Sequence, residues 1–403
     1  MAVIHPFRAW RPRPEKVELI ASEPYDVIDT SEARRKAEGF PQSFLHVVRP
    51  EIDLKEGTPF DDDSVYKKGT ENLKELLESD DFVQDKKPSV YVYRLIMEGR
   101  SQLGVFACVS VEDYDNEVIL KHELTRPAKE DDRTRHILTQ SAHAEPVMLT
   151  FRDDENITQK CEQVVVNEQP LFDFTADDGV RHTLWQVPEP KGLVGAFSKI
   201  PKLYVADGHH RCKSASRAAE ELRNKNKHHT GKEEYNFFPA VLFPMDQMQI
   251  MAYNRIVYDV PDEFMEKLGE TVKLRPDADP KPSKKGEVSF YYKGSWYGFI
   301  LPSKDHPNSV ERLDVYRLQE FILEPLLGIT DPRNDGNIDF VGGIRGIRAL
   351  EWAVDKGKAD LAISMYPTSI KELLAVSDAK LLMPPKSTWF EPKLRSGLLI
   401  HTF

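Results

Sequence analysis

The stretch from Lys202 to Lys225 constrains the fold of this chain most, because signals for a strand, a turn and a helix follow one another in it. Leu203 to Val205 is a short apolar run of β-favouring residues, and Asp207-Gly208 ends it. From His209 onward, small and apolar residues recur at helical spacing, at Cys212, Ala215, Ala219 and Leu222. The stretch therefore predicts a strand that enters a helix through a tight turn.

The turn itself carries side chains that indicate an anion-binding site. The first backbone N–H groups of a helix have no intrahelical partners, and the helix dipole favours negative charge beside them. His209, His210 and Arg211 occupy this first turn, where positive charge opposes the dipole unless an anion or a carboxylate lies nearby. We therefore predict that Asp207, Gly208 and these three residues bind phosphate. The alternative is that Asp207 caps the helix and the histidines are only solvated.

The string ADGHHR, residues 206–211, resembles the corresponding turn of the ParB and sulfiredoxin superfamily. That superfamily includes nucleotide-binding partition proteins and a free-serine kinase. In its members the turn and the following helix hold nucleotide phosphates. The resemblance therefore implies that Asp207 to Arg211 form the phosphate end of a nucleotide-dependent site.

A second group of charged residues follows a predicted strand directly, within Leu120 to His136. Side chains at the end of a strand commonly contribute to sites in α/β proteins, so Glu123 is a candidate metal ligand or proton acceptor. The residues expected to contact substrate or neutralise phosphate oxygens are Lys121, His122, Arg126, Lys129 and Arg133. Pro127 divides the group into an extended first half and a helical second half. The alternative for the second half is an ordinary solvated helix face.

Two loops complete the predicted site. Asp26 follows Pro24-Tyr25 on a stiff loop, which suits either a catalytic base or an ordinary turn aspartate. Near the C-terminal end, Pro384-Pro385 stiffens a loop whose lysines and hydroxyls form a plausible anion cradle. Its contributing residues are Lys386, Ser387, Thr388 and Lys393. If the site spans two domains, we expect Lys386 and Lys393 to face the Asp207 turn.

Composition limits the partners and the compartment. The net charge is −11, with 66 acidic against 55 basic residues, which argues against binding nucleic acid through a basic surface. The first residues lack the apolar core of a secretory signal, and no run approaches the roughly 18 apolar residues of a membrane span. Cys108, Cys161 and Cys212 are scattered, without metal-ligand spacing, which fits a reducing compartment. We expect a cytoplasmic protein that binds neither nucleic acid nor membranes.

With 403 residues, 40% of them apolar, the chain is long enough for two domains. Strand and helix patterns alternate, so we predict an α/β (α+β) fold. We expect a phosphate-binding domain at residues 1–247, of ParB/sulfiredoxin-like type with insertions, and a smaller mixed α/β domain at 248–403. Among the predicted elements are a short helix that Thr30 or Ser31 caps and that runs through Ala37, a strand at Ser43 to Arg49, hairpins turning near Gly99 and Lys293-Gly294, and a βαβ-like unit around Gly342-Gly343.

Several longer strings together resemble, over nearly the full length, a prokaryotic family catalogued as domain of unknown function 1015. The strings are PFRAWRPRPEKVELIASEPYDVI, HVVRPEIDL, KHELTRPAKEDDR, ADGHHR, FVGGIRG and PPKSTWFEPKLRSGL. This resemblance implies that the chain is a member of that family, but the family itself implies little about activity. Activity is implied only by the shorter resemblance of the Asp207 turn to the free-serine kinase.

These observations favour a phosphotransferase that acts on a hydroxylated metabolite such as serine. Its cofactors would be Mg²⁺ and a nucleotide or pyrophosphate as phosphate donor, and its base would be Asp26 or Glu123. Walker, protein-kinase and Rossmann motifs are absent from the sequence. One alternative is a nucleotide-binding switch or scaffold without turnover. Another is metal-assisted hydrolysis through His209, His210 and Glu123.

Overall fold

The computed structural model describes residues 1–303 and 308–403. Among these, the chain forms two compact units, each with its own sheet and helices. The first unit comprises Met1–Leu120, Thr125–Met248 and Pro392–Phe403, and the second comprises Lys121–Leu124 and Gln249–Glu391. Both units mix helices with strands, which confirms the α/β class predicted from the sequence.

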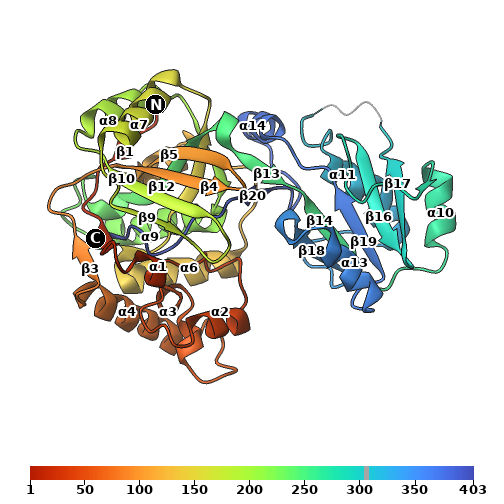
Figure 1. The fold of residues 1–403 in the computed structure, drawn as a ribbon, viewed down its shortest axis with the longest axis horizontal. Helices are drawn as coiled ribbons and strands as arrows, with labels where there is room; N and C mark the ends of the chain where they lie inside the picture. Colours follow the sequence, from red (N-terminus) through yellow and green to blue (C-terminus); the bar gives the residue numbers. More distant parts are fainter. Residues whose placement is uncertain (304–307) are drawn as a thin grey trace. The chain divides into compact units, whose positions relative to one another are not determined.

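The first unit is built on a mixed sheet with the strand order β6-β11-β8-β12-β5-β4-β10-β9, and β1 pairs with β5 (Figure 1). The pairs β6–β11 and β8–β12 are parallel and the other neighbours are antiparallel. Two small pairs, β2–β3 and β7–β21, flank this sheet. The strands are β1 (Ile4–His5), β2 (Trp10–Pro12), β3 (Phe82–Gln84), β4 (Tyr91–Met97), β5 (Arg100–Ser110), β6 (Ile119–Leu120), β7 (Ala142–His143), β8 (Val147–Phe151), β9 (Phe172–Thr175), β10 (Arg181–Gln186), β11 (Leu203–Asp207), β12 (Phe237–Pro244) and β21 (His401–Thr402).

Helices cover this sheet, with α7 and α8 to one side of it and α2, α3 and α4 to the other in Figure 1. The helices of the first unit are α1 (Val17–Ile20), α2 (Thr30–Ala37), α3 (Leu45–Val48), α4 (Asp63–Glu78), α5 (Val111–Asp115), α6 (Pro127–Gln140), α7 (Glu155–Asn167), α8 (Lys191–Phe197) and α9 (His209–Lys225). Cys212, Ala215 and Ala219 of α9 belong to the main core cluster. The predicted apolar face of this helix is therefore its packing face. Burial raises the pKa of the Cys212 thiol to about 12, as suits a core residue.

The predicted turns follow their local chemistry. The hairpin of β4 and β5 turns at Glu98 and Gly99, which both have positive φ, and the later hairpin turns in the same way at Lys293 and Gly294. Positive φ at both central residues matches the twist of the strands they join. Pro127 is the first residue of α6, as the divided pattern predicted, because its missing N–H costs nothing there.

Two local predictions were wrong. The segment Ser43 to Arg49, predicted as a strand, contains the short helix α3, in which Leu45, Val47 and Val48 are buried. A short run that is buried on all sides has no periodicity to separate strand from helix, and packing decides instead. The cap of α2 is Asp29, whose carboxylate accepts the Glu32 N–H at 2.7 Å, one residue before the predicted Thr30.

The second unit is built on an antiparallel sheet with the order β15-β17-β16-β19-β14-β18, beside the small pair β13–β20. Because β18 and β19 both pair antiparallel with β14, they run parallel to each other and α13 connects them. The strands are β13 (Gln249–Met251), β14 (Tyr253–Val257), β15 (Arg275–Pro276), β16 (Glu287–Tyr292), β17 (Ser295–Ile300), β18 (Ile338–Gly342), β19 (Leu361–Met365) and β20 (Trp389–Glu391). The helices are α10 (Phe264–Thr271), α11 (Asp314–Leu318), α12 (Glu324–Leu327), α13 (Ile347–Asp355) and α14 (Ile370–Asp378). Across the described residues, no helix combines the length and apolar composition needed to cross a membrane.

Candidate functional site

The site begins at the turn between β11 and α9. Asp207 is the last residue of β11, Gly208 follows with φ +98°, and α9 starts at His209. The first N–H to bond within the helix is that of Cys212, which donates to the Gly208 carbonyl at 2.9 Å. The N-cap position is Gly208, which has no side chain, so no side-chain cap bond is made from that position. The helix therefore begins at this turn without a side-chain cap to balance the positive end of its dipole.

Asp207 is paired with cations instead. Its Oδ2 lies 3.3 Å from Lys393 Nζ and 4.0 Å from Arg211 Nη2. Burial alone would raise the pKa of this carboxyl, but Lys393 and Arg211 outweigh it and hold the pKa well below its usual range. Asp207 is thus a permanently charged carboxylate at neutral pH, held between a lysine and an arginine.

Arg211 is held from its other side by the strand next to β11. Because β8 runs antiparallel to β11, the start of β8 lies beside the turn, and Arg211 Nη1 donates to the Pro146 carbonyl. The side chain is 9% exposed, and its buried Nε has no hydrogen-bond partner among the described residues. Asp26 and Asp207 raise the pKa of Arg211 despite its burial. The arginine stays charged, with one donor still available.

Glu145 is a central residue that the sequence analysis missed. It precedes β8, its side chain is 7% exposed, and it accepts hydrogen bonds from the Tyr25 N–H at 3.0 Å and the Ser396 hydroxyl at 3.1 Å. Burial raises the pKa of Glu145, although Arg211 and Arg133 oppose the shift. Glu145 lies shortly before a strand, whereas Glu123 was singled out because it follows one, so the same reasoning did not identify Glu145.

Arg133, one of the predicted cations, extends from α6 into the same cluster. Its guanidinium contacts Asp132 at 2.8 Å, Glu145 at 3.9 Å, and the face of the Tyr25 ring at 4.1 Å from the centroid. Arg133, Glu145 and Arg211 all line a cavity of about 40 Å³, room for a few waters. We call Asp207, Arg211, Lys393, Glu145 and Arg133 the Asp207 cluster.

The other predicted residues of the first unit surround this cluster. His209 is buried, and His210 Nε2 accepts the Arg126 N–H at 3.0 Å, which ties the start of α9 to the start of α6. Burial lowers the pKa of His210, so the ring accepts this bond in its neutral form. Lys129 lies over the Phe60 ring, 5.0 Å from its centroid. Asp26 is exposed and acts on the pKa values of both His210 and Arg211.

The remaining predicted residues belong to the second unit. The Lys121–Glu123 segment follows β6 as predicted, and the His122 carbonyl accepts the Met383 N–H at 2.7 Å. In the loop that starts at Pro384, Ser387 donates to the Pro384 carbonyl at 2.7 Å, and Thr388 contacts His122 Nε2 at 3.4 Å. Lys386 lies 5.4 Å from the centroid of Tyr253. Their participation in a phosphate site, and that of Lys121 and Glu123, stays a prediction.

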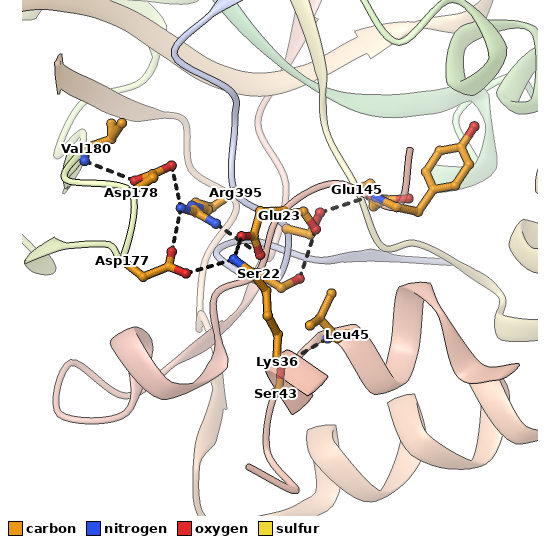
Figure 2. Close-up of polar contacts among 12 residues, drawn as sticks. Ser22, Glu23, Lys36, Ser43, Leu45, Glu145, Asp177, Asp178, Val180 and Arg395 are labelled. Atoms are coloured by element: carbon orange, nitrogen blue, oxygen red, sulfur yellow. Dashed lines mark hydrogen bonds and ion pairs between the residues drawn. The ribbon is translucent and has the colours of Figure 1, made fainter. Parts of the chain in front are cut away.

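An ion network fixes the segment that carries Lys393. Figure 2 shows Arg395 between three carboxylates, at 3.3 Å from Glu23, 3.2 Å from Asp177 and 2.6 Å from Asp178. Lys36 bonds Glu23 and Asp177 in the same view. Burial disfavours the charge of Arg395, but the carboxylates raise its pKa. The network holds the segment 392–403 against the rest of the first unit and so positions Lys393.

Gly208 is required by both its conformation and its surroundings. Its φ of +98° is strained for any other residue, and a Cβ would lie 3.1 Å from Arg211 Nε and from Val147 Cγ1. We expect Gly208→Ala to destabilise the protein by about 1–3 kcal/mol. Gly195→Ala is the matched control, because Gly195 lies inside α8 with no atom within 4 Å of a Cβ, and alanine there gains up to about 1 kcal/mol. Urea unfolding of both variants tests this, and equal stabilities would contradict it.

The arrangement suits an anion more than proton transfer. Three N–H groups of a long helix, a lysine with three donors and an arginine with an available donor lie around one turn. The cations on either side balance the negative charge of Asp207 and lower its pKa, so it is a weak base. Proton transfer would therefore need a carboxylate other than Asp207, whereas charge neutralisation is already in place.

The family described as "Protein of unknown function (DUF1015)" matches residues 4–316. No curated protein matches the chain. Among solved structures, a free serine kinase mutant in complex with AMP is 13% identical with a TM-score of 0.38, covering 73% of this chain and 92% of that one. SbnI with a C-terminal truncation, from Staphylococcus aureus, is 13% identical with a TM-score of 0.39, covering 72% and 85%. A conserved hypothetical protein from Pyrococcus furiosus is 11% identical with a TM-score of 0.36, covering 73% and 95%.

Proposed function

The chain belongs to the DUF1015 family, and from the Asp207 cluster of this member we propose that it binds a nucleotide or pyrophosphate and transfers a phosphoryl group to a small hydroxylated metabolite. A serine-like amino acid is the substrate that the resemblance of the ADGHHR turn implies. The observation that carries the proposal is the uncapped start of α9, where Lys393 and Arg211 lie on either side of Asp207. Such a start is a phosphate site by its dipole and its N–H groups.

Each member of the cluster has a part in this proposal. The N–H groups of the first turn of α9 and Lys393 would hold phosphate oxygens, while Arg211 neutralises charge as it develops. Asp207 orients both cations, since it is charged and contacts each of them. Glu145 and Arg133 would hold Tyr25 in place, since Glu145 accepts the Tyr25 N–H and Arg133 lies over its ring. Phosphoryl transfer requires little beyond such positioning and charge neutralisation.

The base in this proposal is Asp26, with Glu123 as the alternative. Asp26 is an exposed carboxylate on the loop next to Tyr25, and its charge reaches both His210 and Arg211. A proton acceptor must be accessible to the substrate hydroxyl, which the paired Asp207 and the buried Glu145 are not. Asp26→Asn would accordingly remove turnover and leave nucleotide binding.

Mg²⁺ fits the chemistry of these residues. It takes oxygen ligands and usually keeps only one or two carboxylates, completing its shell with phosphate oxygens and water. Where Glu123 serves as the base, Asp26 is the exposed carboxylate near the turn that would hold the ion. When bound, Mg²⁺ would neutralise phosphate charge. The residues of the chain would still orient the donor and accept the hydroxyl proton.

Ligand-dependent stability tests the proposal. We expect ATP, ADP or pyrophosphate to raise the melting temperature, since a ligand at 100 times its Kd stabilises the folded state by about 2.7 kcal/mol. Lys393→Ala should abolish most of this shift. Lys199→Ala, an exposed lysine of the same unit, is the control and should keep it. No shift with any phosphate-bearing ligand, with or without Mg²⁺, would overturn the proposal, and binding without phosphoserine formation would favour the nucleotide switch.

A further inference from the structure

The second unit contains a pocket of about 300 Å³ that the proposed function does not use. It lies where β18 and β19 end. These two strands lie on either side of β14, antiparallel to it and parallel to each other. In α/β proteins, ligands commonly bind outside the carboxyl ends of parallel strands. The pocket is lined entirely by residues of the second unit, so it is a feature of that unit alone.

One wall of the pocket is a glycine turn at the start of α13. Gly343 donates its N–H to the Ala252 carbonyl at 2.7 Å, and a Cβ at Gly343 would lie 2.7 Å from that oxygen. Gly346 has φ +73° and precedes Ile347, the first residue of α13. Gly346, at the N-cap position of this nine-residue helix, has no side chain to cap it, and the first turn contains no acidic residue. Its N–H groups and dipole therefore face the turn uncompensated.

The floor of the pocket carries two buried polar side chains with unused hydrogen-bonding capacity. Asn254 of β14 is 3% exposed, and Ser364 of β19 is 2% exposed. Arg255 pairs with Ile363, so the next pair along the strands is Asn254 opposite Ser364, on one face of the sheet. Asn254 Oδ1 accepts the Met365 N–H at 3.1 Å. Among the described residues, neither the Asn254 amide hydrogens nor the Ser364 hydroxyl donates to a protein acceptor, and both side chains line the pocket.

The described side chains that line the pocket carry positive charge and no negative charge. Among the described residues that line the pocket, Lys281 is the only ionisable one, and it is exposed at the mouth. The remaining walls are partly apolar, from Ile250, Met251 and Ile347. A helix start, an amide, a hydroxyl and a lysine are all donors, and no carboxylate opposes them. The pocket therefore selects against cations and for an oxyanion.

We propose that this pocket binds the oxyanion of a small metabolite, a phosphate or a carboxylate, at the start of α13. The oxygens accept from the α13 N–H groups, from Asn254 and from Ser364, and Lys281 supplies the balancing charge. A compact apolar part of the ligand packs on Ile250 and Met251. The inference is independent of the Asp207 cluster, because the pocket belongs to the other unit and requires no phosphoryl transfer.

Titration of the full chain with inorganic phosphate, sulfate and acetate, at constant ionic strength in chloride, tests the proposal by calorimetry and melting temperature. Phosphate or acetate should show a binding step, separate from any phosphate binding at the Asp207 cluster, that Asn254→Asp weakens by at least about tenfold, because the new carboxylate repels the anion and still accepts the Met365 N–H. The relative affinities of phosphate and acetate identify which oxyanion the pocket prefers.

Two further variants separate a real site from a folding defect. Ser364→Ala removes one donor with little change in shape and should weaken the same step several-fold, as should Lys281→Ala. Lys284→Ala changes an exposed lysine of the same loop outside the pocket and should leave the step unchanged. The Asp207 cluster is excluded as the source if Lys393→Ala also leaves the step unchanged. An affinity equal in the native protein, Ser364→Ala and Lys281→Ala would overturn the proposal.

Discussion

Asp207→Asn is expected to lower the rate of phosphoryl transfer by at least about a hundredfold, while the variant still folds. The substitution keeps the shape of the side chain and removes the charge that orients Lys393 and Arg211. Both cations would then lack their carboxylate, so the phosphate end of the site loses its geometry. Steady-state transfer from ATP to serine, with melting temperature measured beside it, checks the result.

Variants of the other carboxylates distinguish a catalytic base from a residue that acts through phosphate binding. Glu123→Gln and Asp26→Asn test the two candidate bases, and loss of rate with normal nucleotide binding identifies the one that accepts the proton. Asp207→Asn should instead weaken binding and rate together, because it acts through the cations that hold phosphate. Full activity in folded Asp207→Asn and Glu123→Gln variants would contradict the kinase assignment.

A double variant separates charge balance from function at Asp207. Lys393→Met alone leaves Asp207 with Arg211, and Asp207→Asn alone leaves Lys393 without its partner. Combining the two changes removes both charges of the closest pair, so part of the lost stability should return. Activity should not return, since Lys393 itself holds phosphate in the proposal. Recovery of activity in the double variant would show that Asp207 and Lys393 serve stability alone.

The sequence predicted those parts of the site that depend on neighbours in the chain. The change from strand to helix at Asp207-Gly208 is local, and so is the start of α6 at Pro127. Arg133 and Lys393 were predicted as cations of the site, but their partners were not, because the pairing of Lys393 with Asp207 joins distant parts of the chain.

The missed residues have a physical reason in common. Glu145 became central because β8 runs antiparallel to β11, which brings the start of one strand to the end of the other. No short stretch of sequence determines strand order and direction, so neither β8 nor β11 alone predicts that the two strands pair. The wrong strand at Ser43 to Arg49 is a related case, since packing decided a segment whose pattern was ambiguous.

Arg395→Ala should produce the largest loss of stability, about 3 kcal/mol, or roughly 2–4 °C in melting temperature for each kcal/mol. The side chain is 3% exposed and contacts Glu23, Asp177 and Asp178, so its removal takes away the cation that all three carboxylates share, and Lys36 still pairs with Glu23 and Asp177. Asp177 and Asp178 are partly exposed, which places the loss at the lower end for a buried ion pair.

Arg181→Ala is the matched control for this prediction, because Arg181 also bonds a carboxylate, that of Asp173, but is 50% exposed. Such a surface pair contributes at most about 1 kcal/mol. Arg395 holds the same segment as Lys393, so Arg395→Ala should also reduce the stabilisation by nucleotide, whereas Arg181→Ala should not. Urea unfolding with and without ADP measures both effects. If the two variants unfold alike and respond alike to ADP, the Arg395 network neither stabilises the first unit nor positions Lys393.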